Sequence, residues 1–81
     1  MNDTDIAAAV AAALNEIAPE IDTATFPRDA SLREEAELDS MDFLNFVVAL
    51  HERLGIEIPE SDYAALTTFD DCVAYLARRL G

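Results

Sequence analysis

The sequence DSMDFLNFVVALHERLG, residues 39–55, is the clearest helical stretch of the chain and decides its fold class. Asp39 can act as the N-cap, and Asp42 three residues later gives the pattern of a capping box. Gly55 suits the far end, because a residue in the left-handed conformation often closes a helix. Since the side chains between these ends are apolar nearly all round, we expect a central helix over residues 39–54 that packs on several sides.

Helical patterns continue on both sides of this central stretch. Between residues 3 and 18, four large apolar residues recur on one helical face among alanines, and Pro19 marks the end. Thr68 begins a second capping box, with Asp71, ahead of a C-terminal run at helical spacing. Residues 60–66 offer one or two further turns. The apolar positions are Ile6, Val10, Leu14 and Ile17 in the first helix and Phe69, Val73, Leu76 and Leu80 in the last.

The remaining segments have no sustained helical period. Residues 19–39 contain Pro27 and scattered charges, so we interpret them as a long loop that Phe26 and Leu32 attach to the core. Residues 56–59 alternate like a strand but are too short and too isolated to build a sheet. The sequence therefore predicts an all-α fold: a small four-helix bundle with a long loop between helices 1 and 2 and a short helix 3. A single domain over residues 1–81 is expected.

The composition excludes several classes of function. Seventeen Asp and Glu against five Arg give a net charge of -12, which repels nucleic acid and favours basic protein partners. With 52% apolar residues the chain is too hydrophobic to remain disordered. The first residues lack the basic start of a signal peptide, and no apolar run is long enough to cross a membrane. We therefore expect a cytoplasmic monomer with no membrane span and no nucleic-acid partner.

Few residues suggest catalysis or metal binding. His51 is the only histidine and has no Ser or Cys three or four residues away, so it favours a surface or partner-contact role. The acidic pairs 34–35 and 70–71 lack the regularly spaced ligands and central glycine of a calcium-binding loop, so we interpret them as solvated charges. Cys72 is the only cysteine and is expected in the core. We expect neither an enzyme nor a metal site.

Ser40 stands out by its position at the start of the central helix. Unsatisfied backbone N–H groups and the helix dipole can stabilise a phosphate attached at this point. A serine in the first turn of a helix is nevertheless common for purely structural reasons. Its position alone leaves both interpretations open.

The segments around Ser40 resemble the acyl carrier proteins, the phosphopantetheine-dependent carriers. Glu37-Leu38-Asp39-Ser40-Met41-Asp42 is similar to the Asp-Ser-Leu attachment motif of that family, and residues 49–59, ALHERLGIEIP, look like the stretch that follows it. Leu66-Thr67-Thr68-Phe69 and Val73-Ala74-Tyr75-Leu76 resemble the entry to the family's last helix and part of that helix. With the first helix, the resemblance spans nearly the whole chain.

The resemblance implies a four-helix bundle in which Ser40, next to Asp39, receives 4'-phosphopantetheine from coenzyme A through a phosphopantetheinyl transferase. The thiol of this arm then holds acyl groups as thioesters for fatty-acid, polyketide or related specialised biosynthesis. The carrier itself needs no catalytic residue, and its partners are acyl-transferring or acyl-activating enzymes with basic patches. The implied partner contacts are Asp42, Phe43, Leu44, Asn45, Val48, His51 and Glu52.

Two departures from the family pattern favour a specialised carrier. Ala36-Glu37 replaces the usual Leu-Gly before the attachment motif, so a different turn into the central helix is expected. Asn45 and His51 stand where the family usually has exposed acids, and Phe43 is expected to add apolar surface. Because charge complementarity governs partner choice, these changes predict partners unlike those of the housekeeping system.

Two other functions compete with an acyl carrier. An unmodified acidic adaptor would use the bundle only to bind partner proteins. A peptidyl or aryl carrier would share the attachment serine but load amino or aryl acids. The strong acidity and the segment Glu57-Ile58-Pro59 favour the acyl type.

Overall fold

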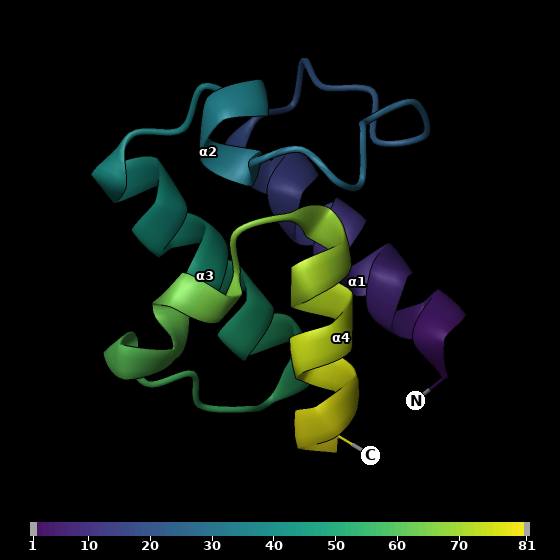
Figure 1. Ribbon diagram of the computed structural model, residues 1–81, viewed down its shortest axis with the longest axis vertical. Coiled ribbons are helices and arrows are strands. Elements are labelled where there is room, and N and C mark those ends of the chain that lie inside the picture. Colours follow the sequence, from purple (N-terminus) through teal and green to yellow (C-terminus); the bar gives the residue numbers. More distant parts are fainter. Residues whose placement is uncertain (1, 81) are drawn as a thin grey trace.

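The computed structural model, which describes residues 2–80, arranges three long helices around one core and places two short helices at its edge (Figure 1). The three long helices pack together because α1 lies against both α3 and α4. The all-α prediction is confirmed. The elements are α1 (Asp3–Ile17), α2 (Leu32–Glu35), α3 (Ser40–Leu54), the 3-10 helix η1 (Glu60–Ala65) and α4 (Phe69–Leu80).

The ends of the long helices follow the capping signals of the sequence. Asn2 caps α1 by accepting a hydrogen bond from the Asp5 N–H at 2.8 Å. Thr68 caps α4 in the same way, since its hydroxyl accepts from the Asp71 N–H at 3.0 Å. At the end of α3, Gly55 adopts φ 66° and its N–H donates to the carbonyl of residue 51 at 2.8 Å. Local chemistry therefore fixes where each helix starts or stops.

The core is built from the apolar faces of the three long helices and from single side chains of the connectors. Cys72 is fully buried, as predicted, and so is Leu32 of the loop; Phe26 is buried too. These two loop side chains attach the segment between α1 and α3 to the bundle, which confirms their predicted role. The fully buried side chains include Ile6, Val10, Leu14, Phe46, Leu50, Leu66 and Leu76.

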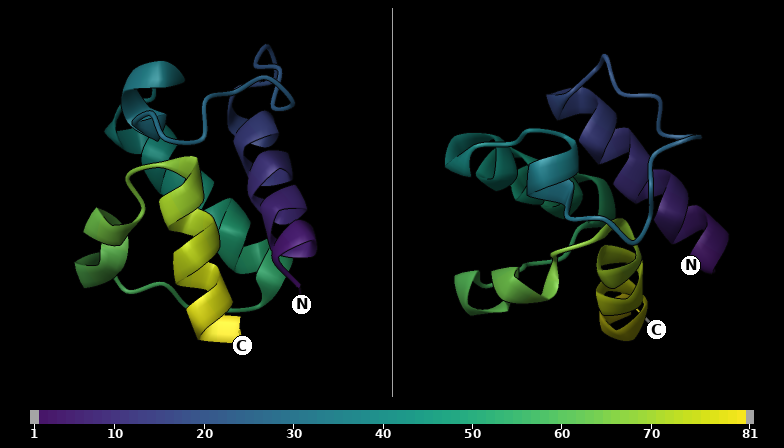
Figure 2. Two further views of the ribbon diagram at one scale, coloured as in Figure 1. Left: turned by 45° about the vertical axis from the view of Figure 1, so that its right-hand side comes forward. Right: turned by 45° about the horizontal axis from the view of Figure 1, so that its top comes forward.

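The long loop crosses the end of the bundle at which α1 ends and α4 begins (Figure 2). Arg28 ties it to α4, because its guanidinium donates to the Asp70 carboxylate at 2.8 Å and lies 4.8 Å from the centre of the Phe69 ring. Within the loop, Ser31 caps the single turn α2, and the Leu32 N–H donates to the Thr67 carbonyl at 2.9 Å. The sequence did not predict α2, because four residues are too few to show a helical period.

The turn from α2 into α3 contains Glu37, which adopts the left-handed conformation with φ 55°. This is the position at which glycine is expected from the family resemblance. A glutamate pays a steric cost of about 1 kcal/mol in this conformation. Two hydrogen bonds hold the turn: the Glu37 N–H donates to the Glu34 carbonyl at 3.3 Å, and the Leu38 N–H donates to the Arg33 carbonyl at 2.8 Å.

Replacing Glu37 with glycine should therefore stabilise the fold. We expect Glu37→Gly to raise the free energy of unfolding by about 0.5 kcal/mol, since relief of strain exceeds the entropy that glycine adds to the unfolded chain. The thermal midpoint should rise by about 2–4 °C. Glu37→Gln is the control, because it removes the same charge without relieving strain. Equal midpoints for the two variants would show that the charge, and not the backbone, limits stability here.

Candidate functional site

Ser40 is the first residue of α3, and its side chain is exposed. The cap before it is complete: the Asp39 carboxylate accepts from the Asp42 N–H at 2.8 Å, and the Asp42 carboxylate accepts from the Asp39 N–H at 3.4 Å. N–H groups at the very start of a helix have no acceptor within it, and the helix dipole adds partial positive charge there. The Ser40 hydroxyl thus lies where an attached anion is stabilised.

Arg33 of α2 lies beside this hydroxyl. Its Nη2 donates to Ser40 Oγ at 3.3 Å, and its guanidinium lies 5.6 Å from the centre of the Phe43 ring. Neighbouring contacts fix α2 in place, since Ser31 caps it and the buried Leu32 anchors it. The sequence reasoning missed Arg33; the signal was that it is the only Arg or Lys between residues 29 and 52 of a strongly acidic chain.

A pocket of about 520 Å³ opens next to Ser40, between α2, α3 and η1. One side of the pocket carries the polar groups of Arg33 and Ser40. Aromatic rings of Phe43 and Tyr63 line it further, with their centroids 6.0 Å apart in an edge-to-face arrangement. The remaining lining residues are Ser31, Leu44, Glu60, Ala64, Leu66 and Thr67. A group attached to Ser40 therefore starts at the rim of a cavity with polar and apolar walls.

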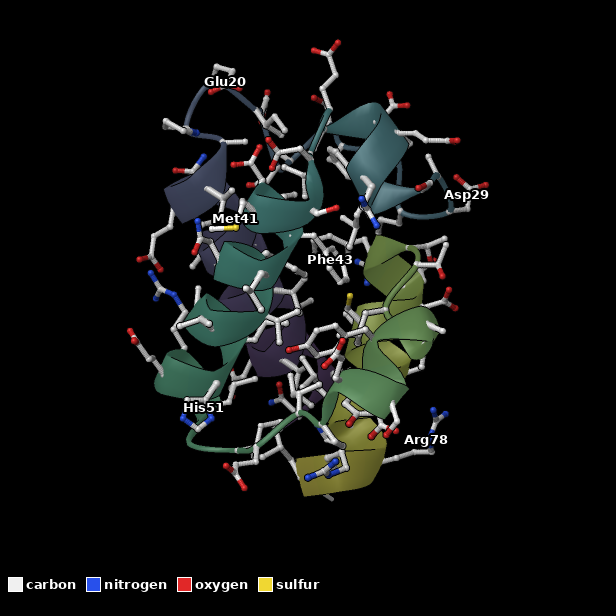
Figure 3. The ribbon with its side chains drawn as sticks, turned by 90° about the vertical axis from the view of Figure 1, so that its left-hand side faces the viewer. Glu20, Asp29, Met41, Phe43, His51 and Arg78 are labelled. Carbon is white, nitrogen blue, oxygen red and sulfur yellow. The ribbon has the colours of Figure 1, made fainter. Side chains whose placement is uncertain are left out.

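One face of α3 is apolar and open, which differs from the prediction of a helix packed on several sides. Met41, Leu44 and Val48 expose 64%, 41% and 44% of their surface. Their spacing of three and four residues places them on one side of the helix. In Figure 3, Met41 lies near the start of α3 and His51 near its end. Other parts of the molecule therefore cover α3 on its inner side and leave this outer face open.

Phe43 is not part of this open face. It is 8% exposed, with its ring 6.2 Å from that of Phe46, and Figure 3 shows it directed from α3 into the molecule. The expectation that Phe43 adds apolar surface is therefore wrong. The reason is that α2 and η1 cover its side of the helix, as the contacts with Arg33 and Tyr63 show.

The other residues expected at a partner contact follow the outer side of α3. Asn45 and Glu52 are exposed, whereas Asp42 is half-buried and engaged in the capping box. His51 is exposed, and its Nδ1 donates to the carbonyl of Ile56, because a carbonyl can only accept. His51 thereby holds the turn after α3.

The remaining reactive groups lie away from Ser40. Cys72 is fully buried, and this burial, with a smaller effect of the Asp71 charge, raises the pKa of its thiol to about 12. The thiol is thus protonated and unreactive at neutral pH. Among residues 2–80 no group of three His, Cys, Asp or Glu side chains could hold a metal ion. No helix in the same range is long and apolar enough to cross a membrane.

Comparison with known proteins gives a consistent match. The family model described as the phosphopantetheine attachment site matches residues 4–76. The acyl carrier protein of Rubrobacter xylanophilus is 34% identical over 56 residues, which are 69% of either chain. That of Acidothermus cellulolyticus is 30% identical over 77 residues, 95% of this chain and 90% of its own length. That of Renibacterium salmoninarum is 30% identical over 79 residues, 94% of this chain and 93% of its own.

Proposed function

The chain belongs to the acyl carrier protein family, non-catalytic carriers with a phosphopantetheine attachment site, and on this premise we propose that Ser40 is the attachment residue. The observation that carries the proposal is the exposed Ser40 hydroxyl at the capped N-terminus of α3. The site fits a phosphate ester, because the first turn of the helix and the Arg33 guanidinium both offer donors to an anion. When bound, the arm supplies a thiol that holds acyl groups as thioesters.

The other residues of the site prepare Ser40 for this role. Asp39 and Asp42 fix the start of α3, so the hydroxyl keeps one position relative to the helix axis. The Asp39 carboxylate faces the Asp42 N–H, which offsets part of its repulsion toward a phosphate. Ser31 and Ser61 do not share this arrangement, since Ser31 caps α2 and Ser61 lies within η1. We therefore assign the attachment to Ser40 alone.

Phosphopantetheinyl transferase and the enzymes of a carrier-dependent pathway are the partners that family membership implies. We propose that they dock on the open face of α3, where Met41, Leu44 and Val48 offer apolar contact. Asp42, Asn45, His51 and Glu52 border this face and would meet basic and polar groups. Because Asn45 and His51 stand where the family usually has exposed acids, we propose that the partner enzymes belong to a specialised pathway. We also propose that residues 1–81 form a single carrier domain and that the protein is a cytoplasmic monomer.

The proposal predicts the mass of the protein after coexpression with a broad-specificity phosphopantetheinyl transferase. We expect one added phosphopantetheine per chain, because one serine has the required environment. Intact-mass spectrometry makes the measurement, and protein expressed without the transferase is the control. An unmodified chain after coexpression would contradict the proposal and favour an adaptor that binds partners without an arm.

A further inference from the structure

We infer that Arg33 binds the phosphodiester created by attachment at Ser40 and holds the first part of the arm at the rim of the adjacent pocket. The inference rests on the proposed function, because it concerns the group that Ser40 would carry. It adds a binding residue on α2, outside the helix that carries the serine. The ligand chemistry is an anionic phosphodiester, not the cargo at the other end of the arm.

The geometry places the guanidinium beside the atom that would bear the phosphate. Arg33 Nη2 donates to Ser40 Oγ at 3.3 Å. On esterification Oγ becomes a bridging oxygen, and the two charged oxygens of the phosphodiester lie one phosphorus atom beyond it. A guanidinium has five N–H donors in a planar fork, which suits two phosphate oxygens together. Arg33 can therefore exchange its contact with a neutral hydroxyl for contacts with an anion by a small change of rotamer.

Arg33 and Arg78 are the two arginines that form no ion pair within the described residues, and of these two only Arg33 lies beside Ser40. Arg28, Arg53 and Arg79 form ion pairs with Asp70, Glu16 and Asp62 at 2.8, 2.8 and 3.5 Å. Between residues 2 and 80, no such pair involves Arg33. Its guanidinium instead lies near the Phe43 ring, a contact that orients the group without neutralising it. The positive charge thus remains available to a phosphate.

The position of Arg33 determines where the arm starts. Arg33 and Ser40 both line the pocket of about 520 Å³ between α2, α3 and η1. Met41 points away on the open face of α3, being 64% exposed. A phosphodiester held by Arg33 therefore directs the arm toward the pocket, which shares Leu44 with the open face of α3, and away from Met41. Release of this contact would free the arm to enter a partner's active site.

The test uses holo protein and the phosphorus nucleus of the attached group as its probe. Wild type, Arg33→Gln and Arg78→Gln are each loaded with phosphopantetheine, and intact mass first establishes that every sample carries one arm. Arg78→Gln is the matched control: it removes the same charge from an exposed arginine near the end of α4, far from the start of α3 (Figure 3). The phosphorus-31 chemical shift and relaxation rate are then measured at low and high salt.

We expect the equilibrium constant between bound and free phosphodiester to fall about tenfold in Arg33→Gln, as for loss of a charge-assisted hydrogen bond. In Arg33→Gln the phosphorus-31 chemical shift and relaxation rate should approach those of a freely moving arm. In Arg78→Gln both values should match those of the wild type. Raising the salt should move the wild-type signal toward that of Arg33→Gln, because this exposed pair is screened. Arg33→Lys should recover only part of the effect, since lysine lacks the planar fork.

Identical phosphorus signals in loaded wild type and Arg33→Gln would overturn the inference while leaving the attachment at Ser40 intact. A wild-type chain that accepts no arm would instead refute the proposed function, and the inference with it. If Arg33→Gln accepts phosphopantetheine too slowly for the measurement, the salt titration of the loaded wild type tests whether Arg33 binds the phosphodiester. A wild-type phosphorus signal that salt does not move counts against binding by Arg33.

Discussion

Ser40→Ala is expected to accept no phosphopantetheine under conditions in which the wild type becomes fully loaded. The substitution removes the oxygen to which the arm would be joined, and no other serine lies at the capped start of a long helix. The effect should therefore be complete loss of loading and not a reduced rate. Incubation with coenzyme A and a broad-specificity transferase, followed by intact-mass spectrometry, makes the comparison.

The same variant should fold as the wild type does. Asp39 still caps α3, the Ser40 side chain is exposed, and alanine is a better helix former than serine. We expect a change of less than about 0.5 kcal/mol in the free energy of unfolding. Ser61→Ala is the control, because it removes an exposed serine from η1 and should load normally. Loading of Ser40→Ala would refute the site, and its unfolding would assign Ser40 a structural role.

Phe46→Ala should have the largest effect on stability. Phe46 is fully buried in the core, and its ring lies 6.2 Å from that of Phe43. Truncating a buried phenylalanine removes its hydrophobic transfer energy and leaves a cavity, at a cost of about 3–5 kcal/mol. For a domain of this size the whole stability is roughly 4–12 kcal/mol. The thermal midpoint should fall by about 15 °C or more, and part of the population should unfold at room temperature.

Val48→Ala is the matched control for this prediction, because it truncates an apolar residue of the same helix that is 44% exposed. Its free energy of unfolding should change by less than about 0.5 kcal/mol. Thermal unfolding followed by circular dichroism measures both variants. A similar loss in the two would mean that the open face of α3 is covered in solution, for instance by a second copy of the chain.

The features that could be predicted from the sequence are those fixed by neighbours along the chain. The caps at Asp39, Gly55 and Thr68 lie where their side chains or backbone freedom suggested, because a cap involves residues only a few positions apart. The burial of Phe26 and Leu32 was also predictable, since large apolar side chains in a polar loop have few other places to go.

The features that could not be predicted depend on how separate elements pack and on irregular turns, neither of which a helical period in the sequence records. An apolar pattern on α3 does not show which side is covered, so the burial of Phe43 and the exposure of Met41 were unexpected. Arg33 on α2 reaches Ser40 across the turn between α2 and α3, a contact that no helical period in the sequence indicates. The backbone at Glu37 illustrates a third case: its neighbours impose a left-handed conformation that its own side chain disfavours.

Attachment at Ser40 is tested by peptide mapping with mass spectrometry of the protein isolated from its native cell. We expect the peptide containing Ser40 to carry one phosphopantetheine, either with a free thiol or with an acyl group in thioester linkage. The mass of that acyl group would also identify the cargo. Unmodified Ser40 in all of the native protein, or an arm on a different residue, would contradict attachment at Ser40.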